Sequence, residues 1–260
     1  MNGHVKEQLE DEMKRNLEML EKEILDLMNI SIVQLSTKVG SQVQYCTNIA
    51  GKQNESNYFV VNDDIAEIDF TYKGKTGYIE CHSKDDYERP VGARFYVDCD
   101  NYLRIQNQTI NKKRRRLGKP KGWKELLTTN AKKAIRYFHR GHIIAYSLGG
   151  DKEIHGRTCK ALISLFVQTA WSNMGKDVNK KGFDNKFSQW HFEEKVTKAL
   201  KNSSVCLDSR PIYRDKADII PIGIHLQAVT ENESLFNVFI PNIDPNIKIN
   251  YKNCTFELKK

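Results

Sequence analysis

The fold of this chain is decided by the stretch FHRGHIIAYSL, residues 138–148. It places His139 and His142 three positions apart around an arginine and a glycine, directly before an apolar run. Such a run predicts a mostly buried strand. A histidine beside a buried strand is often only structural, so the surrounding sequence must show whether these two carry chemistry. The apolar members of the run are Ile143, Ile144, Tyr146 and Leu148.

Helical and strand-like patterns follow this stretch. After a glycine-bearing loop, residues 165–175 (LFVQTAWSNMG) carry apolar side chains at helical spacing, and residues 184–200 predict a second helix. Residues 223–242 and 247–258 alternate in polarity as antiparallel strands do. The order strand, loop, helix, helix, strands predicts an α+β fold, with an antiparallel sheet flanked by helices.

The chain before the quoted stretch is less uniform. Residues 58–97 contain strand-like runs, whereas residues 98–130 are basic and turn-rich and predict irregular structure. Residues 5–30 predict an amphipathic helix, because apolar residues recur at steps of three and four. That helix could pack on its own domain or serve as a dimerisation or docking helix. We expect an accessory region over residues 1–90, made of this helix and a small β-rich segment, and a second domain over residues 91–260.

Charge is segregated along the chain. Residues 1–70 carry a net charge of −7 and residues 71–260 a net charge of +15, within the formal total of +8. Between Arg104 and Arg136, twelve basic side chains stand with a single acid, Glu125. Such a patch is typical of proteins that bind phosphate backbones, although a solvated loop is the simpler alternative. The residues that we expect to contact nucleic acid are Lys112, Lys113, Arg114, Arg115, Arg116, Lys119 and Lys121.

Cysteine usage and hydropathy bear on where the protein acts. Six cysteines are scattered without a Cys-x-x-Cys pair, and a chain of 260 residues does not need disulfides to fold, which favours a reducing compartment. No signal-peptide or transmembrane stretch is evident. We expect a cytoplasmic protein, or one exported without a classical signal peptide, and no membrane partner. His155 and Cys159 have a spacing that suits zinc, which leaves a zinc-stabilised structural module as an alternative.

An ordered set of motifs carries a resemblance to a known family. The motifs are RGH at 140–142, QTAWSN at 168–173 and FEEKV at 192–196, accompanied by KPKGW at 119–123 and FNVFIPNIDPNIKINY at 236–251. This set resembles the DNA/RNA non-specific endonucleases of the ββα-metal superfamily. The bacterial branch that contains streptodornase-like and competence-associated DNases is the most similar. The resemblance implies a ββα-metal nuclease core.

The resemblance, which extends over residues 95–258, implies a role for each matched residue. His142 matches the catalytic histidine and would deprotonate water as a general base, since an unperturbed imidazole titrates at about 6.5. Asn173 would offer its amide oxygen to Mg²⁺, with Mn²⁺ as the alternative ion, because hard cations prefer oxygen ligands. Glu193 would accept hydrogen bonds from metal-bound waters, and Arg140 would bind a phosphate oxygen.

Two positions depart from the family pattern. His139 stands where the family usually has an acid, and Ser164 stands where it tends to have an asparagine. We expect His139 to be a neighbour that modulates the site rather than the base. Gln168 could support the ligands around the metal or simply pack inside its helix. Glu193 could instead form a salt bridge on a helix surface.

Together these inferences predict a Mg²⁺-dependent, sequence-non-specific endonuclease that hydrolyses phosphodiester bonds of DNA or, alternatively, RNA. A basic patch contacts the backbone rather than base edges, so little sequence preference is expected. The alternative from another class is a catalytically degenerate module that binds nucleic acid without cutting it, which the His139 departure favours. Because an active nuclease threatens its own cell, we also expect a toxin or defence effector. A regulatory partner, or homo-oligomerisation through the N-terminal helix, would restrain it.

Overall fold

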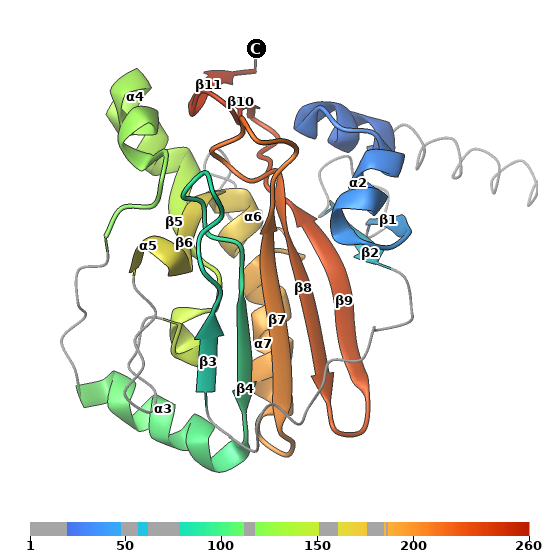
Figure 1. Ribbon diagram of the computed structural model, residues 1–260, viewed down its shortest axis with the longest axis vertical. Helices are drawn as coiled ribbons and strands as arrows, with labels where there is room; N and C mark the ends of the chain where they lie inside the picture. Colours follow the sequence, from blue (N-terminus) through green and yellow to red (C-terminus); the bar gives the residue numbers. More distant parts are fainter. Residues whose placement is uncertain are drawn as a thin grey trace, which may run out of the picture.

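A computed structural model describes residues 20–47, 57–61, 78–111, 118–150, 161–175, 185 and 187–259. Seven strands form one antiparallel sheet in the order β1-β2-β9-β8-β7-β4-β3 (Figure 1). Two further strand pairs, β5-β6 and β10-β11, stand apart from it. The predicted combination of helices with an antiparallel sheet is therefore confirmed. The sheet strands are β1 Val43–Thr47, β2 Asn57–Val61, β3 Tyr78–Cys81, β4 Ala93–Val97, β7 Val205–Ile212, β8 Gly223–Thr230 and β9 Ser234–Pro241.

Strands from distant parts of the chain meet in this sheet. β2 pairs with β9, which sets Phe59 opposite Phe239, and β3 pairs with β4. The boundary expected near residue 90 falls between β3 and β4, which are hydrogen-bonded neighbours. Residues before and after that point therefore contribute to the same sheet.

One apolar core lies between the sheet and α7 (Gln189–Ala199), which packs behind β7 and β9 in Figure 1. Successive side chains of a strand point to opposite faces, so alternate residues of each strand enter this core. Ile224 and Leu226 of β8 are fully buried there, and α7 contributes Phe192 and Val196. Each buried side chain of this size stabilises the fold by about 1.5–3 kcal/mol. The helix predicted over residues 184–200 is confirmed as α7.

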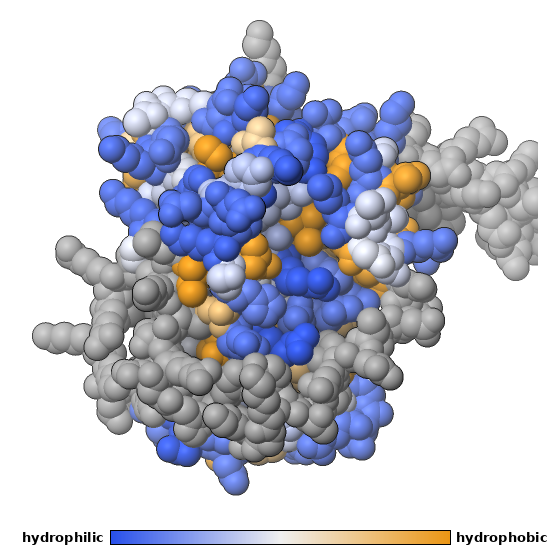
Figure 2. Space-filling model, viewed as in Figure 1, coloured by the Kyte–Doolittle hydropathy of each residue, from blue (hydrophilic) through white to orange (hydrophobic). Residues whose placement is uncertain are grey.

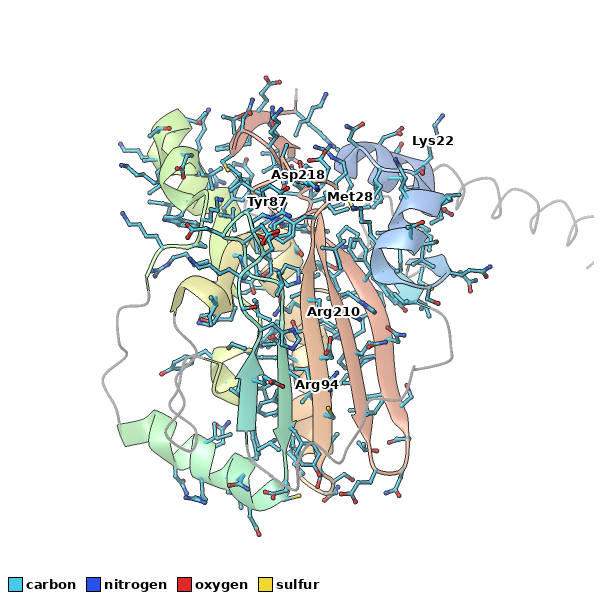
Figure 3. The ribbon with its side chains drawn as sticks, in the orientation of Figure 1. Lys22, Met28, Tyr87, Arg94, Arg210 and Asp218 are labelled. Carbon is cyan, nitrogen blue, oxygen red and sulfur yellow. The ribbon has the colours of Figure 1, made fainter. Side chains whose placement is uncertain are left out.

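A second apolar cluster joins the helices near the N-terminus to the C-terminal strands. In the helix over residues 20–28, Met28 has no exposed surface and belongs to this cluster (Figure 3). The helix α2 (Ile32–Val39) follows and begins with a capping box at Ser31. The described part of the amphipathic helix thus packs on its own chain. Residues 5–19 lie outside the described residues, so a docking role for them stays a prediction.

Two helices occupy a region that was predicted to be irregular. That prediction was wrong, because α3 (Cys99–Asn111) and α4 (Trp123–Tyr137) fall largely within residues 98–130. Leu126 and Ala134 of α4 are fully buried, while its lysines and arginines are exposed. Lysine and arginine are good helix formers, and in this stretch the dense charge obscured the helical period of the few apolar residues.

The apolar run after the two histidines is buried, but it is not a strand. β5 (Phe138–His142) ends where the run begins, and a short 3₁₀ helix covers Tyr146–Leu148. Ile143 donates its backbone N–H to the Ser164 carbonyl (2.9 Å), and its own carbonyl accepts from the Ser209 hydroxyl (2.6 Å). These two hydrogen bonds satisfy the Ile143 backbone, as a partner strand would otherwise do. The sequence pattern does not reveal such partners, because they come from distant parts of the chain.

The segment predicted as one helix over residues 165–175 divides into two elements. The first is the strand β6 (Leu165–Thr169), in which every residue is buried, and the second is the short helix α6 (Ala170–Met174). The helical prediction was wrong for the first half, because a short, wholly buried segment shows no period that separates strand from helix. The C-terminal strands were predicted correctly. They are β8, β9, β10 Ile247–Asn250 and β11 Thr255–Leu258.

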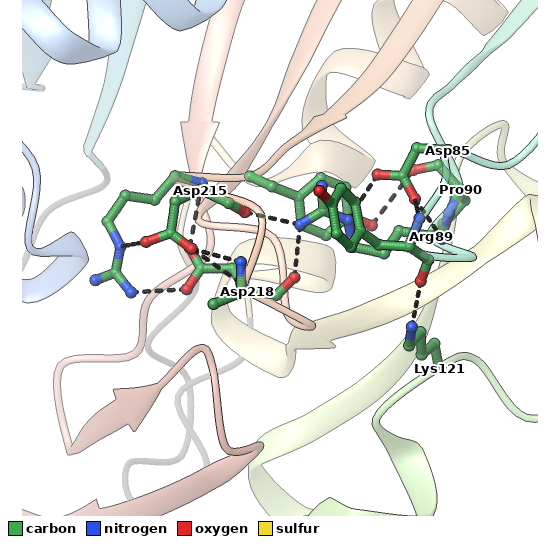
Figure 4. Close-up of polar contacts among 10 residues, drawn as sticks. Asp85, Arg89, Pro90, Lys121, Asp215 and Asp218 are labelled. Carbon is green, nitrogen blue, oxygen red and sulfur yellow. Dashed lines mark hydrogen bonds and ion pairs between the residues drawn. The ribbon is translucent and has the colours of Figure 1, made fainter.

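A buried arginine joins two loops at one end of the sheet (Figure 4). Arg89, only 7% exposed, pairs with Asp85 at 2.7 Å and donates to the carbonyls of Asp215 (2.8 Å) and Asp218 (2.7 Å). Its guanidinium also lies 4.1 Å from the ring centre of Tyr213. A buried charge is tolerated only when it is paired and hydrogen-bonded, and Arg89 meets both conditions. This cluster holds loops together.

The cysteines correct one expectation. Cys81 is disulfide-bonded, with its partner outside the described residues, whereas Cys46, Cys99, Cys206 and Cys254 are free thiols. The expectation of a reducing compartment rested on a chain that does not need disulfides to fold, and the bond at Cys81 removes support from that expectation. Positions in the sequence do not show which cysteines come within the few ångströms that a disulfide requires. Among the described helices, none is long and apolar enough to cross a membrane.

Candidate functional site

Most of the residues predicted to carry chemistry lie on β5, β6 and α6, which are neighbours in space, and Glu193 lies on α7. β5 and β6 pair antiparallel, with His139 opposite Gln168 and His142 opposite Leu165. α6 begins directly after β6 and contacts β5. Two strands and a helix thereby bring His139 next to Asn173, although 34 positions separate them in the sequence.

Position 141 requires a glycine because the side chain of Gln168 lies directly against it. A Cβ atom at Gly141 would lie 2.2 Å from Oε1 of Gln168 and 2.8 Å from its Cβ. Gln168 is fully buried, so it cannot move aside into solvent. Only glycine leaves room for this glutamine, which reaches across β5 towards α7.

Buried polar contacts fix the start of α6. Thr169 is its N-cap and accepts from the backbone N–H of Ser172, while the Thr169 hydroxyl donates to the Ile243 carbonyl (2.6 Å). Asn242 accepts from the Thr169 N–H (2.8 Å) and donates to the carbonyls of Val167 (3.0 Å) and Pro221 (2.9 Å). Sequence reasoning missed Asn242, whose partners come from segments far apart in the chain.

Asn173 contacts His139 rather than standing alone on the helix. Its Nδ2 lies 3.2 Å from Nδ1 of His139, and both side chains are partly exposed. With Nδ2 directed at the imidazole, the amide oxygen Oδ1 faces away from it and remains suited to a cation. Gly175 ends the helix immediately afterwards in a left-handed conformation, with φ of 73°.

The donor set fits a hydrated hard cation. Among the described residues, no three His, Cys, Asp or Glu side chains group as metal ligands. An amide oxygen such as that of Asn173 suits Mg²⁺, which usually keeps several waters and takes only one or two protein ligands. The zinc alternative built on His155 and Cys159 falls outside the described residues.

His142 and Arg140 lie further along β5. The His142 side chain is partly exposed, and its ring centre lies 6.4 Å from that of Tyr146. The His142 carbonyl accepts from Nε2 of Gln189 at 2.7 Å. Arg140 is exposed, and its guanidinium donates to the Gly118 carbonyl at 3.4 Å. The Arg140 side chain is therefore accessible to a ligand, whereas His142 exposes part of its surface while its Nε2 is buried.

Glu193 lies in a different environment from these residues. It is 8% exposed and accepts from Nε2 of Gln189 at 2.8 Å and from the backbone N–H of Ala145. Burial raises the pKa of Glu193 to about 8. Gln189 also accepts from Nε2 of Gln168 at 2.9 Å, so it links β5, β6 and α7. Sequence reasoning missed Gln189, although it stands one helical turn before Glu193.

Of the basic residues predicted to bind nucleic acid, two are described. Lys119 is exposed in the segment before α4, and Lys121 is also exposed but donates to the Tyr87 carbonyl. Residues 112–116 lie outside the described residues. The basic residues of α4 are exposed as well, and α4 leads directly into β5; these residues are Lys124, Lys132, Lys133 and Arg136.

A separate polar cluster occupies the opposite face of the large sheet. Figure 3 shows Arg94 and Arg210 on the face towards the viewer, which is mostly hydrophilic in Figure 2. Both arginines pair with Asp208, at 3.4 Å and 3.0 Å. Arg210 also contacts Nδ1 of His225 (3.2 Å), whose Nε2 contacts Asn237 (2.7 Å). Burial lowers the pKa of His225 to about 4, so this imidazole is neutral and its contacts stabilise the sheet.

Comparisons with known proteins support the architecture. No protein-family model matches the chain. NucA from Streptococcus agalactiae with no metal bound is 25% identical, with a TM-score of 0.60, and the match covers 87% of this chain and 94% of that one. The same NucA with magnesium ion bound matches at 22% identity and a TM-score of 0.59, over 87% of this chain and 94% of that one. The Sda1 nuclease with bound zinc ion matches at 16% identity and a TM-score of 0.50, over 84% of this chain and 91% of that one. The protein therefore has the fold of NucA and the Sda1 nuclease.

Proposed function

We propose that this protein is a metal-dependent endonuclease of the ββα-metal type that hydrolyses phosphodiester bonds of DNA without sequence preference. The observation that carries the proposal is the contact between His139 on β5 and Asn173 on α6, at 3.2 Å, three residues from His142. The contact lies in a fold shared with NucA, which has been crystallised with magnesium, and with the Sda1 nuclease.

His142 serves as the general base in this proposal. Its imidazole accepts a proton from a water molecule, whose oxygen forms a bond to phosphorus while the bond to the 3′-oxygen breaks. The products are a 5′-phosphate and a 3′-hydroxyl, which takes its proton from solvent. A positioned base of this kind typically contributes about 10²- to 10⁴-fold to the rate.

Asn173 would hold the metal ion through Oδ1, with His139 orienting the amide through its contact with Nδ2. When bound, Mg²⁺ or Mn²⁺ supplies positive charge next to the scissile phosphate. Arg140 binds a phosphate oxygen as a charge-assisted donor and offsets negative charge in the transition state. The exposed Lys119 and the basic face of α4 bind the neighbouring phosphates, which gives affinity without base readout.

The proposal is tested by incubating supercoiled plasmid with the purified protein and Mg²⁺, with and without EDTA. We expect nicking and linearisation that EDTA abolishes and that His142→Ala reduces by at least about 10²-fold. His82→Ala is the matched control, because His82 lies on a loop outside the site. Plasmid that is retarded in a gel but left uncut would instead establish the alternative, a binding module without catalysis.

The disulfide at Cys81 supports a place of action outside the reducing cytoplasm. A nuclease exported to such a compartment would spare its own cell, consistent with a toxin or defence effector. The test is alkylation of protein purified from its native source without reductant, followed by intact-mass analysis. Reduction before alkylation should expose two additional thiols, and the same mass with and without reduction would contradict an oxidising location.

A further inference from the structure

An exposed aromatic ring lies in the loop between β3 and β4. Tyr87 has 38% of its surface exposed, and its ring centre lies 5.0 Å from the guanidinium carbon of Arg89. Arg89 is buried and is held by the Asp85 carboxylate and by the carbonyls of Asp215 and Asp218. The Tyr87 ring therefore rests on a fixed cation, and its remaining surface faces solvent.

Hydrogen bonds fix the backbone that carries this ring. The Asp85 carboxylate accepts from the backbone N–H groups of Tyr87 (3.0 Å) and Arg89 (2.8 Å). On the other side of the residue, the Tyr87 carbonyl accepts from Nζ of Lys121 (Figure 4). An aromatic side chain has few rotatable dihedrals, so a fixed backbone leaves its ring nearly preorganised for a ligand.

The bond from Lys121 places the ring beside the proposed path of nucleic acid. Lys121 and Lys119 are exposed in the segment before α4. The Gly118 carbonyl of the same segment accepts from the guanidinium of Arg140 at 3.4 Å. Three peptide links separate the two ends of this segment, and they span at most about 11 Å. One short basic segment therefore joins Tyr87 to the arginine that we propose as a phosphate ligand.

The charges around Tyr87 favour a base rather than a phosphate as its ligand. Asp86 and Glu88 flank it in the chain and are exposed. Their carboxylates repel a phosphate, whereas Lys119 and Lys121 attract one. A nucleobase carries no charge, and every base has an aromatic face that can stack on a tyrosine ring. Neighbouring base pairs cover these faces in a duplex, so the ring can take only an unpaired base.

We propose that Tyr87 is a stacking platform for an unpaired nucleobase, while Lys119 and Lys121 contact the phosphates of the same strand. This inference rests on the proposed nuclease function and deepens it by naming a substrate class, nucleic acid with unpaired bases. Because stacking tolerates every base, Tyr87 adds affinity for such strands without adding sequence preference.

The experiment measures fluorescence anisotropy of labelled oligonucleotides in EDTA, so that binding is followed without cleavage. The probes are a thymine single strand, the same strand with abasic sites, and a blunt duplex of equal length. Full-length wild type is compared with Tyr87→Ala and Tyr87→Phe. Leu103→Ala is the control, because Leu103 is 59% exposed on α3, which Figure 1 shows at the opposite end of the molecule from α4.

Tyr87→Ala should weaken binding of the thymine strand by about 5- to 150-fold, the range found when a stacked base loses its aromatic partner. Its affinities for the abasic strand and for the duplex should stay unchanged. Tyr87→Phe should bind all three probes like the wild type, because stacking needs the ring and not the hydroxyl. The slope of log K against log salt should also stay the same, since no charge is removed.

The abasic strand separates stacking from a purely structural role of Tyr87. A ring that only covers Arg89 would affect all three probes alike, so equal weakening of the thymine and abasic strands by Tyr87→Ala would overturn the inference. An equal loss of thymine-strand affinity in Tyr87→Phe or in Leu103→Ala would overturn it as well.

The binding assay also separates this inference from the proposed function. If the thymine strand binds through Tyr87 but the wild type leaves plasmid uncut, the nuclease proposal fails and the stacking site stands. If the wild type cuts plasmid but binds the thymine and abasic strands equally well, the stacking site fails and the nuclease proposal stands.

Discussion

The two sides of β5 are built in different ways. Towards α6, His139 and Asn173 are partly exposed and share one contact of 3.2 Å. Towards α7, Gln168, Gln189 and Glu193 are less than 9% exposed and are joined by successive hydrogen bonds. On one side polar side chains are partly exposed (the open side), and on the other side buried side chains bind the backbone that carries them (the buried side).

This difference provides a way to position a side chain accurately while it remains accessible to a long polymer such as nucleic acid. A catalytic group must remain accessible, so it cannot be held by surrounding its side chain. Its position must come from the backbone, and every polar group of a buried backbone needs a partner. In residues 142–145, Gln189, Glu193, Ser164 and Ser209 supply such partners. If buried side chains fix the backbone in this way, substitutions of buried polar residues should mainly lower the free energy of unfolding. Substitutions of the partly exposed residues should lower activity without changing that free energy.

The largest effect is expected for Asn242→Ala, which removes a buried hydrogen-bond partner of β6. This change leaves the Thr169 N–H and the carbonyls of Val167 and Pro221 without their side-chain partner. An unsatisfied buried polar group costs about 1–3 kcal/mol, so the free energy of unfolding should fall by about 3 kcal/mol or more. Urea denaturation measures it, with the exposed Asn202→Ala as a control that should change stability by less than about 0.5 kcal/mol. A loss below about 1 kcal/mol for Asn242→Ala would mean that the strand and helix are held by packing instead.

Asn173→Ala, on the open side, should lower metal affinity and leave stability nearly unchanged. Removing the amide oxygen should raise the half-saturating Mg²⁺ concentration by at least about 10- to 100-fold, by comparison with the loss of groups around metal sites. Because Asn173 is partly exposed, the Tm of the metal-free variant should differ little from that of the metal-free wild type. Metal titration of activity and thermal melting test both statements. Asn173→Asp is the matched variant, since it keeps an oxygen ligand. Equal loss of metal affinity in both variants would argue against ligation through Oδ1.

The same division explains what the sequence could predict. His139, His142 and Asn173 could be singled out because they lie in motifs that resemble those of a known nuclease family, and not because of their residue types alone. The buried partners Gln189 and Asn242 are ordinary polar residues, and only the folded chain shows that they meet β5 and β6. The strands after residue 220 were predicted because they alternate in polarity over a full strand length. β6 was mistaken for a helix because all of its residues are buried. β2 could not be assigned to the central sheet, because its partner β9 lies more than 170 residues further along the chain.

The smallest effect is expected for Lys119→Ala, at the edge of the open side. Lys119 is exposed, so its loss should leave the Tm unchanged and weaken DNA binding equally for all sequences. Each lost phosphate contact should reduce the slope of log K against log salt by about 1. Fluorescence anisotropy in EDTA over a range of salt concentrations measures that slope without cleavage. Lys201→Ala is the matched control, because Lys201 is also exposed but follows the C-terminal end of α7. If both lysines change the slope to the same extent, DNA binding follows the net charge of the protein and not a track that leads to β5.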